Sequence, residues 1–537
     1  MSDARQPRIL ISDDLDPAAL EVFRRFGLEP EVRTGLGEDE LCQAVREVDA
    51  LVVRSATKVT RRVLEAAQEL RVVGRAGIGV DNVDLEAATE RGVVVMNTPR
   101  GNATTTAELA IALLLALARH IPRADRMVRG GKWKAKGLVG TEVFGKTLGV
   151  IGLGRIGRLV AERGRGLGMK VVAYDPYLAS DAPGAAVAGV ELLDLDALLA
   201  RADFLTLHVP LNDSTRNLIS WEQLSRVKPG ARLIQASRGG IVDEEAVLDA
   251  LTSGKLAGAA FDVFLEEPPP KDHPLLARDD VIVTPHLGAS SEEAQLRVAL
   301  DIAEQIAAFL TRGIAENAVN APALPAEALA EMAPFLLLSE KLGSFLAQRM
   351  KGQIRKVEFT VGGEIARFGV EHLKLAFLVG ALRHTCDRGV NFVNAPALAR
   401  ERGILVLESR EEQAHFRQGE VTVRANEKAG GRTHCLGGAV FGREPRIIAV
   451  DEVRLDLPPR GILLLTRHKD QPGVLGQIGS ILGRYQINIQ RLELAPGREG
   501  TAEPALGFIT LNQEPAPAVL EALRSLGAIE DVQLLRL

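Results

Sequence analysis

The sequence Gly152-Leu153-Gly154-Arg155-Ile156-Gly157 constrains the fold of this chain more than any other feature. It follows Thr147–Ile151, an apolar stretch typical of a buried strand, and it precedes a helical pattern over 155–167. In such a setting the first glycine permits a tight turn, the second lets the backbone approach a pyrophosphate, and the third allows close helix–strand packing. Free N–H groups and the helix dipole then hold the phosphates. The motif therefore predicts a dinucleotide-binding α/β domain.

Asp175 follows the next predicted strand, Lys170–Tyr174, and lies 18 residues after Gly157. At that distance an acidic residue binds the ribose hydroxyls of a dinucleotide, and its charge repels the 2′-phosphate of NADP. NAD is therefore the expected cofactor. The alternative interpretation is a structural glycine turn followed by an unrelated surface aspartate.

Short apolar runs alternate with helical patterns in two series over residues 8–310. Alternation of this kind predicts parallel sheets with helices on both faces. The expected fold class is α/β, with a doubly wound, flavodoxin-like sheet followed by a Rossmann sheet. The expected strands are 8–12, 50–54, 72–75 and 93–96, then 147–151, 170–174, 203–207, 232–235, 258–261 and 281–283. The expected helices are 38–48, 60–68, 104–120, 155–167 and 290–310.

Two proline-rich segments, Ala321–Pro325 and Pro458–Gly461, divide the remainder of the chain. Residues 330–455 mix helix and strand patterns without a catalytic motif, which predicts an α+β unit. The last segment follows the order of a ferredoxin-like βαββαβ unit. Its elements are expected at 462–466, 474–482, 487–494, 505–511, 518–525 and 532–535.

Composition excludes several classes of protein. The 537 residues include 46% apolar and 25% charged residues, as in globular proteins. The net charge of −5 and the 4% of aromatic residues argue against a nucleic-acid partner. The apolar run Leu109–Ala118 is too short to span a membrane, and the N-terminus lacks the apolar core of a signal peptide. Three distant cysteines show no metal-binding spacing, so we expect no metal and a cytoplasmic location.

Three polar side chains, Arg238, Glu267 and His286, each follow one of the last three predicted strands of the second sheet. Open α/β sheets bind ligands at the carboxyl ends of their strands, so these side chains are expected to converge beside the nicotinamide. An imidazole accepts a proton near neutral pH, a carboxylate orients it, and an arginine binds a carboxylate through two hydrogen bonds. The set predicts oxidation of a secondary alcohol. Taken singly, each residue has a structural alternative, such as a capping histidine or a surface cation.

These motifs resemble those of the D-isomer-specific 2-hydroxyacid dehydrogenases over residues 8–317. The resemblance includes Gly74–Asp84 and Asn97–Asn102. It implies cofactor contacts from Gly152, Gly154, Arg155, Ile156, Gly157, Asp175, Val209, Ala236, Arg238, Asp262, His286, Gly288 and Ala289.

The same resemblance assigns catalytic roles. Arg238 is implied to bind the substrate carboxylate and carbonyl, and His286 to act as acid and base. Glu267 is implied to orient His286, because the family places its glutamate directly before the proline, where Glu266 does not lie.

Additional cationic and hydroxyl donors in the first domain suggest a phosphate on the substrate. Arg54 and Ser55 follow a predicted strand, and Arg75 and Asn102 lie in loops that face the same cleft in the family. This combination resembles the phosphoglycerate dehydrogenase family, which implies 3-phosphoglycerate as substrate and the first step of L-serine biosynthesis. The residues implied to bind substrate are Arg54, Ser55, Arg75, Gly77, Ile78 and Asn102.

The segment Gly131–Lys134 resembles the part of that family which reaches a neighbouring subunit. It implies that Trp133 anchors a dimer and that Lys134 or Lys136 adds charge to the partner's site. The resemblance implies a homotetramer, and pairing of the C-terminal units between chains implies at least a dimer.

The two C-terminal units resemble regulatory modules. Residues 318–455 resemble the intervening, anion- or substrate-sensing domain of the long bacterial form, with Lys374 and Arg443 as candidate ligands. The last unit resembles an ACT domain, in which the positions of Asp470 and Asn488 bind an amino acid across two subunits. L-serine is the implied effector, although His468 replaces the tyrosine of some serine-regulated members. The alternative for these two residues is a purely local capping and turn role.

Four domains are therefore expected. They are a substrate domain of 1–98 and 288–317, an NAD domain of 99–287, an intervening domain of 318–455 and an ACT domain of 460–537. The rival interpretations are a related enzyme acting on glyoxylate, hydroxypyruvate or erythronate 4-phosphate, and an NAD-sensing binding protein of the same fold.

Overall fold

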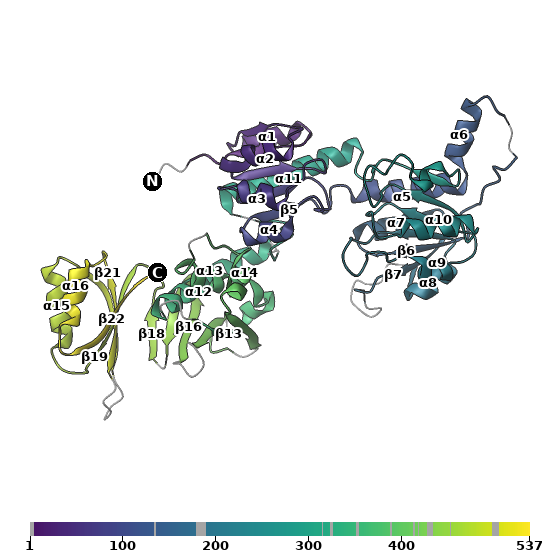
Figure 1. The fold of residues 1–537 in the computed structure, drawn as a ribbon. Helices are drawn as coiled ribbons and strands as arrows, with labels where there is room; N and C mark the ends of the chain where they lie inside the picture. Colours follow the sequence, from purple (N-terminus) through teal and green to yellow (C-terminus); the bar gives the residue numbers. More distant parts are fainter. Residues whose placement is uncertain are drawn as a thin grey trace.

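The computed structural model of the chain describes residues 5–537, except 134–135, 179–188, 314, 323–325, 351–353, 387–388, 412–413, 417, 427–432, 452 and 497–503. Its strands form four sheets of five, seven, six and four strands, each covered by helices (Figure 1). Two parallel α/β sheets are followed by a mixed sheet and an antiparallel sheet. The expected fold class is confirmed for all four.

The first sheet is wholly parallel, in the order β2-β1-β3-β4-β5. Alternate side chains of its strands enter opposite cores, so that Ile9 and Leu10 pack on different faces. This strand order is that of flavodoxin-like folds. The strands are β1 (Ile9–Ile11), β2 (Pro30–Val32), β3 (Ala50–Val53), β4 (Val72–Arg75) and β5 (Val94–Asn97). One core contains α1 (Ala18–Arg25) and α11 (Glu292–Arg312), and the other contains α2 (Glu38–Ala44), the 3-10 turn η1 (Val45–Glu47), α3 (Arg61–Ala66) and α4 (Leu85–Glu90).

The second sheet is also parallel, and its strand order is β12-β11-β10-β9-β6-β7-β8. The order reverses between β6 and β9, and such a switch point is where doubly wound sheets bind nucleotides. The strands are β6 (Thr147–Ile151), β7 (Lys170–Tyr174), β8 (Val190–Leu192), β9 (Phe204–Leu207), β10 (Ala231–Gln235), β11 (Leu256–Phe261) and β12 (Val281–Val283). The helices are α5 (Ala103–Ala118), α6 (Ile121–Arg129), α7 (Arg155–Gly166), α8 (Leu195–Arg201), α9 (Trp221–Arg226), α10 (Glu244–Thr252) and the 3-10 turn η2 (Pro274–Ala277).

Two edge strands, β2 and β8, were not predicted from the sequence. Each has three residues, and neither has a buried side chain. They therefore lack the apolar run that reveals a buried strand.

The third sheet has the order β14-β13-β15-β16-β17-β18, and only the β13–β14 pair is parallel. Two of its helices pack closely against each other because each has a glycine where it faces the backbone of the other helix. A Cβ on Gly343 would lie 2.0 Å from Phe377 O, and a Cβ on Gly380 would lie 1.8 Å from Glu340 O. The strands are β13 (Lys356–Gly362), β14 (Leu405–Glu411), β15 (Glu420–Asn426), β16 (Thr433–Phe441), β17 (Glu444–Val450) and β18 (Val453–Leu457). The helices are α12 (Ala326–Arg349), α13 (Glu371–Arg383), α14 (Ala395–Glu401) and the 3-10 turn η3 (Glu364–Phe368).

The fourth sheet confirms the βαββαβ prediction, with antiparallel strands in the order β20-β21-β19-β22. Its elements are β19 (Ile462–His468), α15 (Val474–Arg484), β20 (Ile489–Ala495), β21 (Ala505–Leu511), α16 (Pro517–Arg524) and β22 (Ile529–Arg536).

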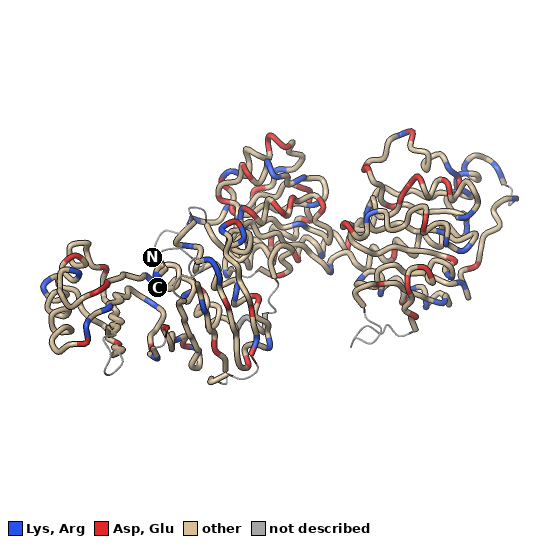
Figure 2. Tube along the Cα trace, turned by 60° about the horizontal axis from the view of Figure 1, so that its bottom comes forward, with Lys and Arg blue, Asp and Glu red and all other residues tan. Residues whose placement is uncertain are grey.

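The third body lies between the first and the fourth, and the body of the second sheet lies at the far end (Figures 1 and 2). Asn391 Nδ2 donates to Gly92 O at 2.6 Å, and Val393 is buried in a core of the first sheet. On the other side, the Gln348 amide donates to Arg536 O and accepts from Arg536 N, both at 2.9 Å. The Gln348 side chain thus pairs with the edge strand β22 as a peptide would.

Acidic and basic residues are interspersed over all four bodies (Figure 2). In the described part of the chain, no single helix is long and apolar enough to cross a membrane, and only α5 and α6, bent by 63°, satisfy that test as a pair. No group of three His, Cys, Asp or Glu side chains with metal-binding geometry occurs among the described residues.

Candidate active site

The glycine turn has the geometry that a dinucleotide needs. Gly152 has φ +90°, and a Cβ there would lie 2.6 Å from His208 O. Gly154, the N-cap of α7, faces open space, whereas a Cβ on Gly157 would lie 2.0 Å from Gly152 O. The open side at Gly154 leaves room for a pyrophosphate against the first N–H groups of α7. The residues present therefore fit a dinucleotide.

Asp175 lies directly beside this turn. Its Oδ2 accepts from Leu153 N at 2.9 Å, and its Oδ1 accepts from Tyr177 N at 3.0 Å. Two backbone N–H groups thus fix the carboxylate at the end of β7, which is the position expected for a residue that binds a ribose.

A cleft of about 700 Å³ runs between the first and second bodies at the carboxyl ends of their strands. Most of the predicted site residues line it, from both bodies. They are Arg75, Ile78, Asn102, Arg155, Ile156, Val209, Ala236, Arg238, Asp262, His286, Gly288 and Ala289. Glu267 joins them through its bond to His286. Arg54, Ser55, Gly77, Gly152, Gly154, Gly157 and Asp175 lie outside the lining set.

His286 and Glu267 form a pair, with 2.7 Å between Nδ1 and Oε2. Burial opposes ionisation of Glu267, but the hydrogen bond and charge of His286, the Phe264 N–H and the charge of Arg238 hold its pKa below the usual range. The carboxylate is therefore ionised at neutral pH. Because it occupies Nδ1, Nε2 is the ring nitrogen left for a ligand.

The backbone around His286 is held by Asp262. Asp262 Oδ1 accepts from Thr284 Oγ1 and Leu287 N, and Oδ2 accepts from Gly288 N. His286 itself has φ +55°, which non-glycine residues adopt rarely. Such strain is typical of functional sites whose surroundings enforce it. Asp262, predicted as a cofactor contact, has both oxygens engaged in this loop.

Arg238 bridges the two bodies. Its Nε donates to Asp81 Oδ2 at 2.7 Å, and its Nη1 donates to Ser237 O at 2.7 Å. A Cβ on Gly79 would lie 1.8 Å from Nη2, so that glycine leaves room for the guanidinium. Asp81 was not predicted from the sequence, although it lies in the motif Gly74–Asp84.

Arg75 has an unusual environment for an arginine. Burial and the neighbouring charge of Arg238 lower its pKa to about 10, and its buried Nε has no hydrogen-bond partner among the residues that the structure describes. The buried Oδ1 of Asn102 also has none. Unpaired buried polar atoms are costly, and both atoms belong to side chains that line the cleft, where a ligand could bond to them.

Arg54 and Ser55 directly follow β3, at the carboxyl end of the first sheet, on a loop that two hydrogen bonds hold in place. Asp13 Oδ2 accepts from the Arg54 N–H, and the Asn82 amide donates to Arg54 O at 2.7 Å. Ser55 is exposed. The buried aspartate, Asp13, was missed because nothing in its local pattern marks it.

Three more residues shape the site and were not predicted. Burial lowers the pKa of His208 to about 4, so the imidazole is neutral beside the glycine turn; it contacts Thr206 Oγ1 at 2.9 Å. Glu244 accepts from Leu265 N at 2.7 Å and contacts His273 Nε2 at 3.0 Å. This contact ties the loop that carries Glu267 to the start of α10. The histidine of His208-Val209-Pro210 was the available signal, but only Val209 was selected.

The predicted effector residues lie at opposite ends of the fourth sheet within one chain. Ile489 and Ile462 both pair with Leu511, so Asn488 lies at the end where β19 begins. Asp470 lies two residues after His468, the last residue of β19, and therefore lies at the other end. One small ligand can contact both only if two copies of the chain contribute one residue each.

The remaining predicted residues that the structure describes do not line the cleft. Lys374 Nζ is paired with Glu408 Oε2 at 2.7 Å, and Arg443 is exposed in the turn after β16. Trp133 is 87% exposed beyond α6. Lys134 lies outside the described residues.

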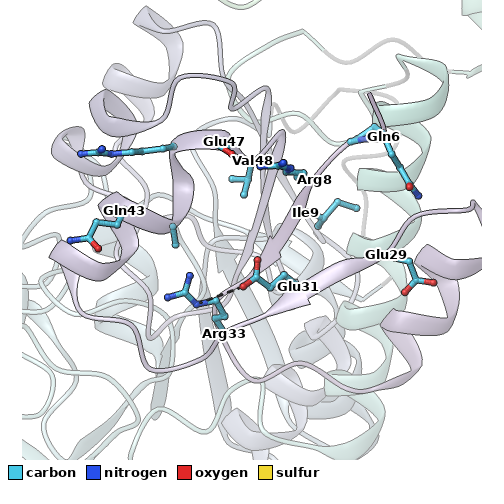
Figure 3. A pocket seen from close by; sticks show the side chains of 12 residues that line it. Gln6, Arg8, Ile9, Glu29, Glu31, Arg33, Gln43, Glu47 and Val48 are labelled. Atoms are coloured by element: carbon cyan, nitrogen blue, oxygen red, sulfur yellow. Dashed lines mark hydrogen bonds and ion pairs between the residues drawn. The ribbon is translucent and has the colours of Figure 1, made fainter. Parts of the chain in front are cut away.

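A second hollow, of about 600 Å³, lies at the amino ends of β1 and β2 (Figure 3). Two of its three arginines have carboxylates beside them: Arg8 pairs with Glu47, and Arg33 Nε lies 3.8 Å from Glu31 Oε1. The third, Arg46, lines the hollow together with a third glutamate, Glu29. It is therefore balanced in charge without a ligand.

Comparison with known proteins places the chain in a family. Residues 111–288 match the D-isomer specific 2-hydroxyacid dehydrogenase NAD binding domain, 331–451 the D-3-phosphoglycerate dehydrogenase intervening domain and 462–528 the ACT domain. The D-3-phosphoglycerate dehydrogenases of Methanocaldococcus jannaschii and Archaeoglobus fulgidus are each 42% identical, over 99% of this chain and 100% of theirs. The chain belongs to the D-3-phosphoglycerate dehydrogenase family.

Family membership confirms the predicted long form, with an intervening domain and an ACT domain. It also confirms the expectation of an NAD-binding oxidoreductase of serine biosynthesis. A crystal structure of a Thermus thermophilus protein is 37% identical, with a TM-score of 0.54, and covers 58% of this chain and 99% of its own. That share corresponds in size to the two α/β bodies and the cleft between them.

Proposed function

We propose that this chain oxidises D-3-phosphoglycerate to 3-phosphohydroxypyruvate with NAD, the first step of L-serine biosynthesis. Full-length similarity to D-3-phosphoglycerate dehydrogenases supports the reaction. The observation that carries the proposal is the His286–Glu267 pair, at 2.7 Å, in the same cleft as Arg238 and the glycine turn.

In this proposal His286 Nε2 accepts the proton of the substrate hydroxyl. The glycine turn and Asp175 would hold NAD, which would supply the acceptor for the hydride on the carbon that bears this hydroxyl. Glu267 holds the imidazole in place through Nδ1 and stabilises the imidazolium that forms. In the reverse direction His286 returns the proton to the carbonyl oxygen, so the same pair serves as base and as acid.

Arg238 binds the substrate carboxylate and polarises the carbonyl that develops, since its planar fork donates two hydrogen bonds. Arg75 and Asn102, with their unpaired buried atoms, hold the phosphate together with Arg54 and Ser55. Gly77 and Ile78 complete the wall of this subsite. A Cβ on Gly77 would lie 1.5 Å from Arg75 Nη1, so only glycine leaves that side chain its position.

The direct test is a substrate panel followed by NADH absorbance. We expect 3-phosphoglycerate with NAD, and 3-phosphohydroxypyruvate with NADH, to give the highest kcat/KM. NADP should be used poorly by the unmodified chain and better by Asp175→Ala, because the carboxylate repels the 2′-phosphate. A preference for glyoxylate, hydroxypyruvate or erythronate 4-phosphate would contradict the proposed substrate, and absence of all turnover would favour an NAD-sensing binding protein.

The proposed division of the chain is a substrate domain of 1–98 and 288–317, an NAD domain of 99–287, an intervening domain of 318–455 and an ACT domain of 460–537. The packing of α11 on the first sheet supports the return of 288–317 to the substrate domain.

The proposed assembly is a homotetramer that uses the arm around Trp133 and pairing of ACT domains. α6 has no buried residue, and Trp133, Val139 and Phe144 are 87%, 88% and 76% exposed, which a partner subunit would cover. Sedimentation should show a smaller species for Trp133→Ala and an unchanged one for Tyr177→Ala, an aromatic residue that is 84% exposed elsewhere on the NAD domain. An unchanged species for Trp133→Ala would contradict the role of the arm.

The proposed effector is L-serine, bound between two copies by Asp470 of one and Asn488 of the other. The opposite placement of these residues within one chain supports a site made by two chains. Calorimetry should show weaker serine binding for Asp470→Ala but not for Glu521→Ala on α16. Equal serine binding by both variants would mean that Asp470 has only a local role in the turn.

A further inference from the structure

Asp81 presents a carboxylate to Arg238 at the position where the proposed substrate brings one. Its Oδ2 accepts from Arg238 Nε at 2.7 Å, and both residues line the cleft. The pair also joins the first body to the second, because Asp81 follows β4 and Arg238 follows β10. A ligand that enters the cleft therefore meets this contact directly.

The surroundings of the Asp81–Arg238 pair contain several arginines and few carboxylates that are not already engaged in other hydrogen bonds. Arg75 is close enough to Arg238 and Arg54 that their charges lower its pKa, while Asp81 acts in the opposite direction. The other acidic side chain of the lining, Asp262, has both oxygens occupied by the His286 loop. Glu267 also interacts with the charge of Arg238 but is bonded to His286, so Asp81 is the carboxylate of the cleft lining that is bonded to Arg238 itself.

The Asp81–Arg238 pair is exposed enough for another carboxylate to replace Asp81. The side chain of Asp81 is 58% exposed and that of Arg238 is 28% exposed. An exposed ion pair contributes little free energy, because water and salt screen it and two side chains must be ordered. Asp81 can therefore turn into solvent at small cost when another carboxylate reaches Arg238.

We infer that Asp81 is a positioning residue that takes the place of the substrate carboxylate beside Arg238 before substrate binds and is displaced when substrate binds. It holds the guanidinium of Arg238 in place between Ser237 O and Gly79, and it competes with the incoming ligand. This inference rests on the proposed function, in which Arg238 binds the substrate carboxylate. It predicts that loss of the Asp81 charge improves binding of carboxylate-bearing ligands.

The test uses the full chain saturated with NADH, so that 3-phosphoglycerate binds without reacting. Calorimetry of Asp81→Asn should give a dissociation constant about three- to fivefold lower than that of the unmodified chain, the range of a weak ion pair. Glycerol 3-phosphate carries the phosphate but no carboxylate, so its binding should not change. Measurement at about 0.15 M salt, where the screening length is about 8 Å, suppresses long-range charge effects.

Glu86→Gln is the matched control, because it removes one negative charge from α4 at a side chain that is 84% exposed and outside the cleft lining. It should leave both ligands unaffected. Unchanged or weaker 3-phosphoglycerate binding by Asp81→Asn would overturn the inference, and so would equal tightening of both ligands. Asp81→Ser, compared by thermal unfolding and the same titration, replaces Asp81→Asn if that variant does not fold.

Arg238→Gln separates this inference from the proposed function. If it leaves 3-phosphoglycerate binding unchanged, the role of Arg238 in the proposed function is wrong. If it abolishes binding while Asp81→Asn has no effect, the proposed function stands and the exchange of carboxylates is refuted.

Discussion

The two ends of the first sheet carry similar side chains and differ in how those side chains are paired. The hollow at the amino ends and the cleft at the carboxyl ends have nearly equal volumes, about 600 and about 700 Å³, and both contain arginines. In the hollow Arg8 pairs with Glu47, and Arg33, whose backbone follows β2, pairs with Glu31. At the carboxyl end Arg75 retains an unpaired buried Nε. The two hollows are therefore alike in volume and charge content, and among the described residues they differ in the unsatisfied buried polar atoms that only the cleft contains.

The position of the second sheet explains why the candidate active site lies at the carboxyl ends of the first sheet. Its carboxyl ends face those of the first sheet across the cleft, so side chains from both bodies meet there. The amino-end hollow is lined by residues 6–48 alone and receives nothing from the second sheet. A site that must hold a cofactor and a substrate together requires the end where two sheets meet.

The largest effect that would separate the two ends is loss of the acid–base pair. We expect His286→Asn to lower kcat by about 10²–10⁴, because that is the usual contribution of a positioned proton acceptor. NADH binding, followed by fluorescence, should stay intact. Glu267→Gln should give a smaller loss, and the exposed neighbour Glu266→Gln none. Near-normal turnover of His286→Asn would refute the proposed mechanism.

The next effect compares one arginine of the cleft with one arginine of the hollow. Arg75→Gln should raise KM for 3-phosphoglycerate by about 10- to 100-fold, the equivalent of one charge-assisted hydrogen bond. Arg33→Gln removes the same charge from the same sheet and should leave KM unchanged, because Glu31 is already its partner. Initial rates at varied substrate concentration give both constants. Equal changes in the two variants would mean that overall charge, and not the Arg75 position, attracts the substrate.

The third effect is the loss of folding stability as the pH decreases, which we expect His208 to cause. Burial lowers the pKa of His208 from 6.5 to about 4 in the folded chain. Between those two values the unfolded chain binds a proton that the folded chain does not, so stability falls as pH decreases from 6.5 towards 4. The thermal midpoint of the NAD domain should therefore drop less between pH 7 and pH 5 in His208→Asn than in the unmodified chain. His415→Asn, at a side chain that is 82% exposed, is the control and should change nothing.

The sequence was informative where chemistry and local pattern coincide. The glycine turn, Asp175, Arg238, Glu267 and His286 all follow predicted strands, so the end of the sheet at which they lie was deducible. The pairing of Asp81 with Arg238 was not, because 157 residues separate them and only the closure of two bodies brings them together. The same holds for Asn391 and Gly92, which are 299 residues apart.

Residues whose function is to hold other residues were also hard to predict. Glu244 and Asp262 act through backbone N–H groups of loops far along the chain. Neither lies in a pattern that distinguishes a structural acceptor from a ligand contact. The edge strands β2 and β8 escaped prediction for a related reason, since neither buries a side chain.

The smallest effect is on the free energy of unfolding, and it concerns the Arg33–Glu31 pair of the hollow. Arg33 and Glu31 are 45% and 64% exposed and lie 3.8 Å apart, so their pair is weak. Arg33→Gln should therefore change the free energy of unfolding by less than about 0.5 kcal/mol, as for most exposed ion pairs. Urea unfolding followed by circular dichroism, with and without added salt, measures this change. A loss above about 1 kcal/mol, or one that a small anion reverses, would show that the hollow requires its charges in the way the cleft does, because a balanced surface pair has no such dependence.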